Sequence, residues 1–185
     1  MLPRMPDPVE IVPYDAAWPG WFAQVGAGLR DVLGDTAVRI DHVGSTAVPG
    51  LDAKPVLDIQ ISVAALEPSD RYAVPLERLG YVFHADNPER TKRYFREPPG
   101  SARTHLHVRR AGSFSQQLPL LFRDFLRADP DTAKQYGELK RSLATTFRDD
   151  RAGYTDAKSD FIWTVIRKAD DWAQDVGWEA GPSDA

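Results

Sequence analysis

Residues suited to holding a phosphate gather between positions 42 and 61, where the chain reads HVGSTAVPGLDAKPVLDIQI. Within this segment, Gly44, Ser45 and Thr46 form a Gly-Ser-Thr turn at the end of a strand-like stretch. Such a turn can present backbone N–H groups and a hydroxyl to a phosphate, and glycine permits a close approach. A turn with a purely structural role is the alternative interpretation, and the Gly44-Ser45 pair alone is compatible with both.

Asp58 lies on the polar side of an otherwise apolar segment, VLDIQI at 56–61. Period-two alternation divides the residues of this segment between two faces of a strand. One face carries Leu57, Ile59 and Ile61, and the other carries Val56, Asp58 and Gln60. An unpaired buried carboxylate is costly, so Asp58 requires a partner. Mg²⁺ shared with substrate phosphate oxygens is one candidate, and pairing with Lys54 or Arg96 is the other. The residue two positions after Asp58 is Gln60, not a second acid.

Two histidines, His105 and His107, are spaced so that they share one face of a strand in THLHVRR. If this strand neighbours 56–61, both polar faces merge into one surface carrying Asp58, Gln60 and the two histidines. That combination suits a divalent metal or a general base working near pH 7. Two half-exposed strand histidines are the structural alternative. His42 either points into the same space or hydrogen-bonds the turn.

Basic residues near these segments predict a local pocket for a triphosphate or another anion. Lys92, Tyr94 and Arg96 share one face of a predicted strand. The other members of this set are Lys54, Arg103 and Arg109. Solvated surface charge is the alternative for any one of them, and also for Lys158 on the last predicted helix. The tryptophans are interpreted as core or inter-helix packing residues, namely Trp18, Trp21, Trp163 and Trp172.

The elements that position these residues follow from the periodicity of apolar residues. Strands are predicted at 9–12, 37–43, 56–61, 81–84, 92–97 and 104–110. Helices are predicted after Trp18-Pro19 up to Gly34, at 69–79, and then in three stripes at 118–126, 133–147 and 155–172, with Thr155 as the N-cap of the last. The pattern predicts an α/β half at 9–112 and a helical segment of about three helices at 113–177, packed as one domain, with flexible termini at 1–8 and 178–185.

Composition excludes several classes of function. A chain of 185 residues with 42% hydrophobic and 27% charged residues is typical of a globular domain. The net charge of −4 argues against nucleic acid held by bulk electrostatics. The absence of cysteine excludes disulfides, thiolate metal sites and cysteine nucleophiles. No apolar run approaches the roughly 18 residues of a membrane span, and the first ten residues lack the apolar core of a signal peptide, which predicts a cytoplasmic protein without a membrane partner.

The ordered motifs of the chain resemble those of the GrpB family, and the resemblance covers nearly the whole sequence. The motifs are VEIVPYDAAWPGWF, HVGSTAVPGLDAKPVLDIQI, RYFR, THLHV, LLFRDFLRADPDTAKQYGELKRSL and YTDAKSDFI. The resemblance implies a nucleotidyltransferase-like α/β (α+β) fold, in which a mixed sheet is flanked by helices.

In active enzymes of this fold, a Gly-Ser turn holds the triphosphate and two acids of a D-x-D/E strand hold two divalent metals. A third acid often lies on a neighbouring strand. In this sequence the turn at 44–45 and the first acid, Asp58, match that pattern. Gln60 replaces the second acid, and His107, with His105, lies where the third acid is expected. An amide supplies no negative charge to a second metal, which puts ordinary two-metal transfer in doubt.

Two functions follow from the resemblance. The first is Mg²⁺- or Mn²⁺-dependent nucleotidyl transfer from an NTP, or another phosphorylated small molecule, to a small acceptor. Asp58, His105 and His107 are its candidate catalytic and metal-binding residues. The candidate nucleotide-binding residues are Gly44, Ser45, Thr46, Lys54, Gln60, Arg96 and Lys158. The alternative is a catalytically inactive nucleotide- or ligand-binding or folding-accessory module, since relatives occur fused to dephospho-CoA kinase. A structural partner acting through the helical half is a third candidate.

Overall fold

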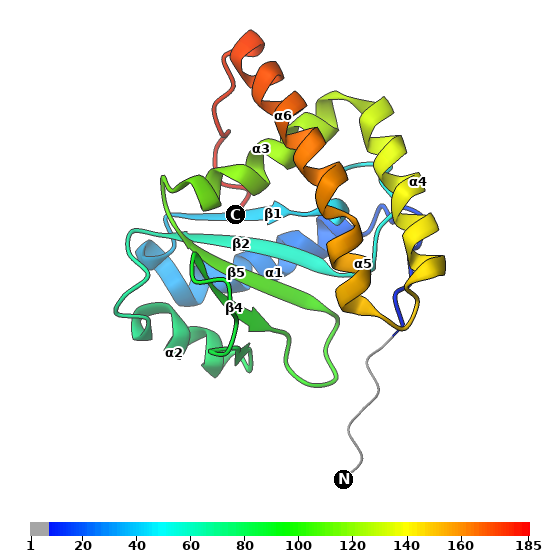
Figure 1. The fold of residues 1–185 in the computed structure, drawn as a ribbon. Helices are drawn as coiled ribbons and strands as arrows, with labels where there is room; N and C mark the ends of the chain where they lie inside the picture. Colours follow the sequence, from blue (N-terminus) through cyan, green and yellow to red (C-terminus); the bar gives the residue numbers. More distant parts are fainter. Residues whose placement is uncertain (1–7) are drawn as a thin grey trace.

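A computed structural model describes residues 8–185 and contains a five-stranded mixed sheet in the order β1-β2-β5-β4-β3. The strands are β1 (Arg39–Val43), β2 (Leu57–Val63), β3 (Val82–Phe83), β4 (Lys92–Arg96) and β5 (Thr104–Arg110). Only the central pair, β2 and β5, is parallel, and the other pairs are antiparallel. Figure 1 shows the sheet with helices on both of its faces.

The helices divide between the two faces of the sheet (Figure 1). Helices α1 (Trp18–Leu33) and α2 (Asp70–Arg78) cover one face. On the other side lie α3 (Phe114–Ala128), α4 (Pro130–Thr146), α5 (Arg151–Ala157) and α6 (Ser159–Val176). Two short 3₁₀ turns, Gly34–Thr36 and Ser45–Ala47, follow α1 and β1. This mixed α/β architecture confirms the predicted fold class.

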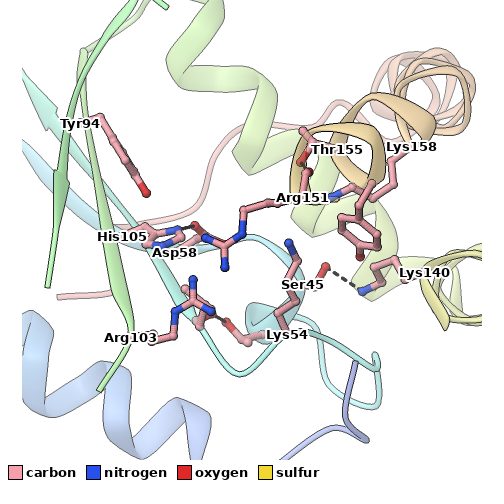
Figure 2. A pocket seen from close by; sticks show the side chains of 13 residues that line it. Ser45, Lys54, Asp58, Tyr94, Arg103, His105, Lys140, Arg151, Thr155 and Lys158 are labelled. Carbon is pink, nitrogen blue, oxygen red and sulfur yellow. Dashed lines mark hydrogen bonds and ion pairs between the residues drawn. The ribbon is translucent and has the colours of Figure 1, made fainter. Parts of the chain in front are cut away.

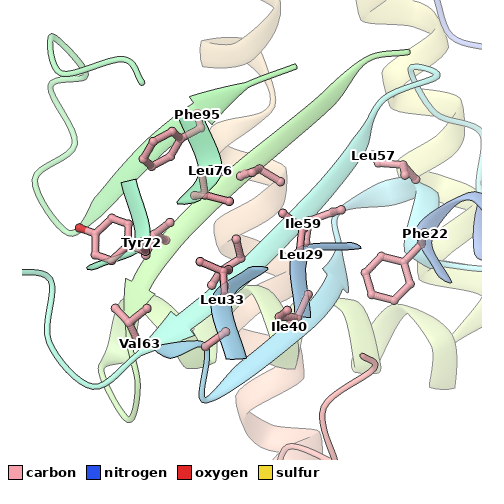
Figure 3. Close-up of a cluster of buried hydrophobic side chains, with 14 of the residues drawn as sticks. Phe22, Leu29, Leu33, Ile40, Leu57, Ile59, Val63, Tyr72, Leu76 and Phe95 are labelled. Atoms are coloured by element: carbon pink, nitrogen blue, oxygen red, sulfur yellow. The ribbon is translucent and has the colours of Figure 1, made fainter. Parts of the chain in front are cut away.

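The main hydrophobic core forms between the sheet and the helices α1 and α2 (Figure 3). Ile59 and Ile61 of β2 are fully buried because the strand's alternation directs them to this face. Leu29 of α1 and Leu76 of α2 pack against them from the helical side. The opposite face of β2 is therefore free to carry polar side chains.

A second hydrophobic cluster joins the segment after the Gly-Ser-Thr turn to the helical segment. Val48 and Leu51 pack with Phe125 of α3, Tyr136 of α4 and Val165 of α6. In addition, Arg127 Nε donates to the Ala47 carbonyl (3.0 Å). The turn is thus held between the sheet and the helices by packing from both sides.

The structure differs from the sequence expectations in two elements and in the exposure of one tryptophan. Residues 9–12 form only a single bridge, Val12 with Ala53, in place of a strand. The last predicted helix is divided into α5 and α6 at Lys158, and Asp150, whose side chain accepts from Gly153 N, caps α5 in place of Thr155. Trp163 is 51% exposed, so its interpretation as a packing residue is wrong.

The C-terminal segment lies beside the edge strand β1 (Figure 1). The backbone N–H groups of Asp184 and Ala185 donate to the Ile40 carbonyl (3.1 Å each). Arg123 Nη1 bridges the Asp184 carboxylate (2.8 Å) and the His42 carbonyl (2.9 Å). The flexibility predicted for 178–185 stays a prediction, and the lead-in at 1–7 lies outside the described residues. Within residues 8–185, no helix has the length and apolar character needed to cross a membrane.

Shortening Ile59 to alanine should test the core. We expect Ile59→Ala to lower the free energy of unfolding by about 2–5 kcal/mol, since it leaves a cavity among fully buried side chains. Val38→Ala is the matched control because Val38 is 52% exposed, and it should change stability by no more than about 0.5 kcal/mol. Urea unfolding measures both variants. Equal losses would show that the packing of Ile59 is not what stabilises the sheet.

Candidate functional site

The parallel pairing of β2 with β5 brings the predicted polar residues onto one surface. Asp58 pairs in register with His105, and Gln60 pairs with His107. Residues paired in register point to the same face, so all four side chains lie on the side away from the main core. The prediction that these two strands are neighbours is confirmed.

Asp58 interacts with both histidines. Its Oδ1 lies 3.0 Å from His107 Nε2 and 3.4 Å from His105 Nδ1. Burial raises the pKa of Asp58, but the hydrogen bonds from His105 and His107 outweigh it and hold that pKa well below its usual range. Burial lowers the pKa of His107 despite the opposing effect of Asp58, so this ring is neutral near pH 7. A neutral His107 that donates its Nε2–H to Asp58 keeps a lone pair on Nδ1.

These three residues fit a divalent metal. One ligand atom from each of Asp58, His105 and His107 lies within 4.8 Å of the others. His105 Nε2 and His107 Nδ1 are buried and have no hydrogen-bond partner among the described residues. A set of one carboxylate and two imidazoles suits Mn²⁺ or another transition metal better than Mg²⁺, which prefers oxygen ligands.

Asp58 and His105 lie at one side of a cavity of about 270 Å³ (Figure 2). Its wall comes from the turn after β1, the strands β2, β4 and β5 with the loops before β2 and β5, and the helices α4 and α5 with Lys158 at the start of α6. The lining residues are Ser45, Thr46, Lys54, Val56, Asp58, Tyr94, Arg103, His105, Lys140, Arg151, Tyr154, Thr155 and Lys158. The cavity therefore has five cationic side chains and a single carboxylate.

Aromatic rings support the lysines of this cavity. Lys54 Nζ and Lys158 Nζ lie 4.3 and 4.4 Å from the ring centre of Tyr154. Lys140 Nζ lies 4.5 Å from the ring centre of Tyr136. Cation–π attraction partly offsets the cost of holding these ammonium groups together.

Crowding lowers the pKa values of the lysines. Burial, together with Lys158, lowers the pKa of Lys140 to about 7, although Asp52 opposes the shift. Burial and the neighbouring cations Lys158, Arg151 and Arg103 lower the pKa of Lys54 to about 8. Burial also lowers the pKa of Lys158. The cavity is therefore a place where positive charge lacks compensation.

Four of the cavity cations differ from other cations of the molecule in that they form no ion pair with a carboxylate of the described residues. Arg39 pairs with Asp41, Arg93 with Glu67 and Arg109 with Glu89, each at 2.7–2.8 Å. In contrast, no Asp or Glu among residues 8–185 forms an ion pair with the following cavity cations: Lys54, Arg103, Lys140 and Lys158. Although the chain has a net charge of −4, these four cations therefore form no ion pair with a carboxylate of residues 8–185.

The predicted turn opens into this cavity. Lys140 Nζ donates to Ser45 Oγ (2.8 Å) and to the Asp52 carbonyl. The Thr46 hydroxyl donates to the Val56 carbonyl (3.2 Å) and accepts from His42 Nε2 (2.9 Å). Ser45 therefore carries the hydroxyl available to a ligand, while Thr46 stabilises the turn.

His42 supports the turn and does not line the cavity. Its ring stacks on Phe22 with centroids 4.9 Å apart, and burial together with the nearby Arg127 lowers its pKa to about 4. A neutral ring donating to Thr46 matches the interpretation in which His42 hydrogen-bonds the turn.

Gly44 has a conformation and a contact that both require glycine. Its φ of 73° and ψ of −171° lie in a region that side chains other than glycine rarely occupy. A Cβ at this position would lie 2.8 Å from Asp58 Oδ2. The turn and the carboxylate are therefore in direct contact.

Two predicted nucleotide-binding residues lie elsewhere. Gln60 is fully buried, and its Nε2 donates to the Gln116 carbonyl of α3 (2.9 Å). Arg96 pairs with Glu97 (2.8 Å) and does not line the cavity. Two other candidates, Gly44 and His107, contact Asp58. The remaining candidates line the cavity, namely Ser45, Thr46, Lys54, Asp58, His105 and Lys158. The roles of all these residues remain predictions.

The sequence alone did not identify several lining residues. Lys140 lies within the helical stripe predicted at 133–147 and is only 2% exposed, but its Nζ reaches Ser45. Arg151 and Tyr154 belong to α5, a helix that was not predicted as a separate element. The one sequence signal that could have identified Lys140 is the presence of a lysine within an otherwise apolar helical stripe.

The mixed sheet and the cavity at β2 and β5 define a nucleotidyltransferase-like fold. Cid1 in complex with its short product ApU aligns with a TM-score of 0.50 and 13% identity over 70% of this chain and 42% of that chain. This likeness concerns the fold alone. The sequence matches the GrpB protein family over residues 8–168, and the chain belongs to that family.

Relatives with higher identity agree with this assignment. The crystal structure of conserved protein GrpB from Enterococcus faecalis aligns with a TM-score of 0.79 and 31% identity, covering 86% of this chain and 96% of that one. UPF0157 protein PA4798 of Pseudomonas aeruginosa is 41% identical over 88% of this chain and 68% of its own length. A dephospho-CoA kinase of Mycobacterium leprae is 32% identical over 92% of this chain but only 48% of its own length.

Gly44 and Gly50 form a matched pair for testing the contact between the turn and Asp58. Both have positive φ (73° and 76°), but a Cβ at Gly50 would meet open space. We expect Gly50→Ala to cost about 1–2 kcal/mol of backbone strain and Gly44→Ala to cost more, since it also displaces the Asp58 carboxylate. Urea unfolding compares the two variants. Equal losses would contradict a tight contact between position 44 and Asp58.

Proposed function

We propose that the chain binds a nucleoside triphosphate in the cation-lined cavity and transfers its nucleotidyl group to a small acceptor in a metal-dependent reaction. The observation that carries this proposal is the convergence of five cations on a cavity that also contains Asp58 and His105. Phosphates are the ligands that such a cluster stabilises best, because each anionic oxygen offsets repulsion already present between the cations.

The turn and the lysines have complementary parts in this proposal. Ser45 Oγ and the backbone of the Gly-Ser turn face the phosphates, and Lys140 reaches them from the position where it now contacts Ser45 (2.8 Å). Lys54 and Lys158, both beside the Tyr154 ring, neutralise the distal phosphates. This division gives the buried Lys140 ammonium an anionic partner in addition to its neutral acceptors, Ser45 Oγ and the Asp52 carbonyl.

Asp58 and His107 would hold the divalent metal. When bound, the metal would polarise the α-phosphate and offset charge that develops there. His105, which lines the cavity, would not ligate the metal and is therefore the available proton acceptor, because an imidazole that ligates a metal carries its proton on the other ring nitrogen.

The transfer itself requires one bond to form and one to break. The acceptor oxygen forms a bond with the α-phosphorus, and the bond from that phosphorus to the oxygen bridging the β-phosphate breaks. Pyrophosphate leaves with the electron pair, and the proton of an acceptor hydroxyl passes to the unligated imidazole of His105. The lysines stabilise the charge that accumulates on the leaving pyrophosphate.

Calorimetric titration with ATP, GTP, CTP and UTP, each with and without Mg²⁺ or Mn²⁺, tests the binding step. We expect at least one nucleotide to bind more tightly with the metal, and Asp58→Asn to remove the metal-dependent gain because the carboxylate charge is lost. Asp131→Asn is the control, since this acid is exposed on α4. Failure of all four nucleotides to bind would refute the proposal.

The position of Gln60 favours a second function, which is nucleotide binding without transfer. This side chain replaces the second acid of the family pattern, and its amide is engaged by Gln116 of α3, away from the cavity. The pyrophosphate assay separates the two functions. Release by the wild-type protein that disappears in Asp58→Asn supports transfer, whereas tight binding without release supports the binding module.

Lys140 gives the site a predictable pH dependence. Its pKa of about 7 in the empty cavity, set by burial and Lys158, should rise when phosphates bind. If the pKa of Lys140 rises on binding, its positive charge contributes fully to nucleotide affinity below pH 7. Above pH 7 this contribution declines, and for a single proton the affinity falls by at most about tenfold per pH unit. We therefore expect nucleotide binding at pH 8 to take up close to one proton at Lys140 and a further fraction at Lys54, whose pKa is about 8.

Titration in buffers of different ionisation enthalpy measures this proton uptake. Lys140→Met should bind more weakly and take up fewer protons, whereas Lys134→Met, an exposed lysine of the same helix, should behave like the wild type. Equal uptake in Lys140→Met would contradict the assignment of the proton to this lysine.

A further inference from the structure

The cations of the cavity occupy two sides of it (Figure 2). Lys140 and Lys158 lie on the helical side, next to Ser45. Arg103 lies on the opposite side with Asp58. The backbone agrees with this placement, because the Arg103 carbonyl accepts from the N–H of Leu57, the residue before Asp58 (3.0 Å). Arg151 extends from α5 toward Asp58, so positive charge runs from the helical side of the cavity across to Arg103.

Arg103 resembles a ligand-binding arginine in its surroundings. The side chain is partly buried, and its Nε is a buried donor without a hydrogen-bond partner among the described residues. No carboxylate of residues 8–185 forms an ion pair with it, although Arg96, one strand away, pairs with Glu97 at 2.8 Å. Leaving a buried guanidinium donor unsatisfied is costly, so an acceptor from a ligand is expected at this place.

The charge of a nucleotide alone does not account for Arg103. A triphosphate carries about four negative charges near neutral pH, of which a divalent metal offsets about two. The five cations, Asp58 and such a metal-bound triphosphate together carry a net charge of about +2. Positive charge therefore remains after the nucleotide binds, and Arg103 carries part of it beside Asp58, on the side where the acceptor would approach the α-phosphate.

We propose that the acceptor is itself an anion, a small molecule bearing a phosphate monoester, and that Arg103 holds this phosphate beside Asp58. The inference rests on the proposed nucleotide-binding function and adds the chemical class of the second substrate. Arginine suits this role because its planar fork binds two phosphate oxygens at once, whereas lysine acts as a point charge. A monoester carries about 1.5 to 2 negative charges at pH 7, enough to compensate Arg103.

Titration of inorganic phosphate into the nucleotide-loaded protein tests this second anion site. The full chain is first saturated with Mg²⁺ and the non-hydrolysable α,β-methylene analogue of the NTP that binds best. We expect phosphate to bind this complex without displacing the nucleotide. Arg103→Met should weaken phosphate binding by about 10- to 100-fold, as expected for a charged hydrogen-bonding partner, and leave nucleotide affinity within about threefold.

Three further variants make the result specific. Arg103→Lys keeps the positive charge but loses the planar guanidinium that binds two oxygens at once, so it should weaken phosphate binding by less than Arg103→Met. If the methionine variant fails to fold, the lysine variant alone tests whether Arg103 binds phosphate. Lys158→Met should weaken the nucleotide and spare phosphate. Arg110→Met, which removes an exposed arginine at the far end of β5, should change neither affinity.

The outcomes distinguish this inference from the function on which it rests. Nucleotide binding without phosphate binding, phosphate that only competes with the nucleotide, or unchanged phosphate affinity in both Arg103 variants overturns the anionic acceptor and leaves nucleotide binding in place. Failure of every nucleotide to bind overturns both.

Discussion

The parallel pairing of β2 with β5 is the constraint on which the site depends. It sets Asp58 opposite His105, although a crossover containing a helix and two strands separates them in sequence. The register is fixed by the other face, where Ile59 and Leu106 are fully buried. A slip of one residue would send the histidines into the core and the leucine to the cavity, so it is excluded by hydrophobic burial. The arrangement of the polar face is thus determined by the apolar face behind it.

The second constraint is electrostatic. Burial and neighbouring cations lower the pKa values of the cavity lysines, and Asp58 and Asp52 oppose this effect only in part. The aromatic rings of Tyr154 and Tyr136 offset a further part of the cost of holding these cations together. Under the proposed function, an anion that enters the cavity would offset the rest. The hydrophobic cluster behind the turn helps to hold the turn against these cations.

The sequence could predict the elements whose signals are local. Alternation located β2 and β5 and placed Asp58 and His105 on the same kind of face, and the Gly-Ser motif located the turn. Lys140 and Tyr154 were not recognised as lining residues, because their positions depend on how α4 and α5 pack over the cavity. A break between α5 and α6 at Lys158 also lacked a glycine or proline signal. Residues brought to a site by tertiary packing leave no periodic trace in the sequence.

Gln60 connects these observations. A carboxylate at this fully buried position would lose the amide N–H that satisfies the Gln116 carbonyl and would place an acceptor against an acceptor. The glutamine thus ties α3 to the sheet, at the cost of a ligand for a second metal. In enzymes with two metals, the second ion supplies positive charge to the phosphates. Under the proposed function, Lys140 and Lys158 from the helical side and Lys54 from the loop before β2 would supply comparable charge, so the lysines would compensate for the missing acid.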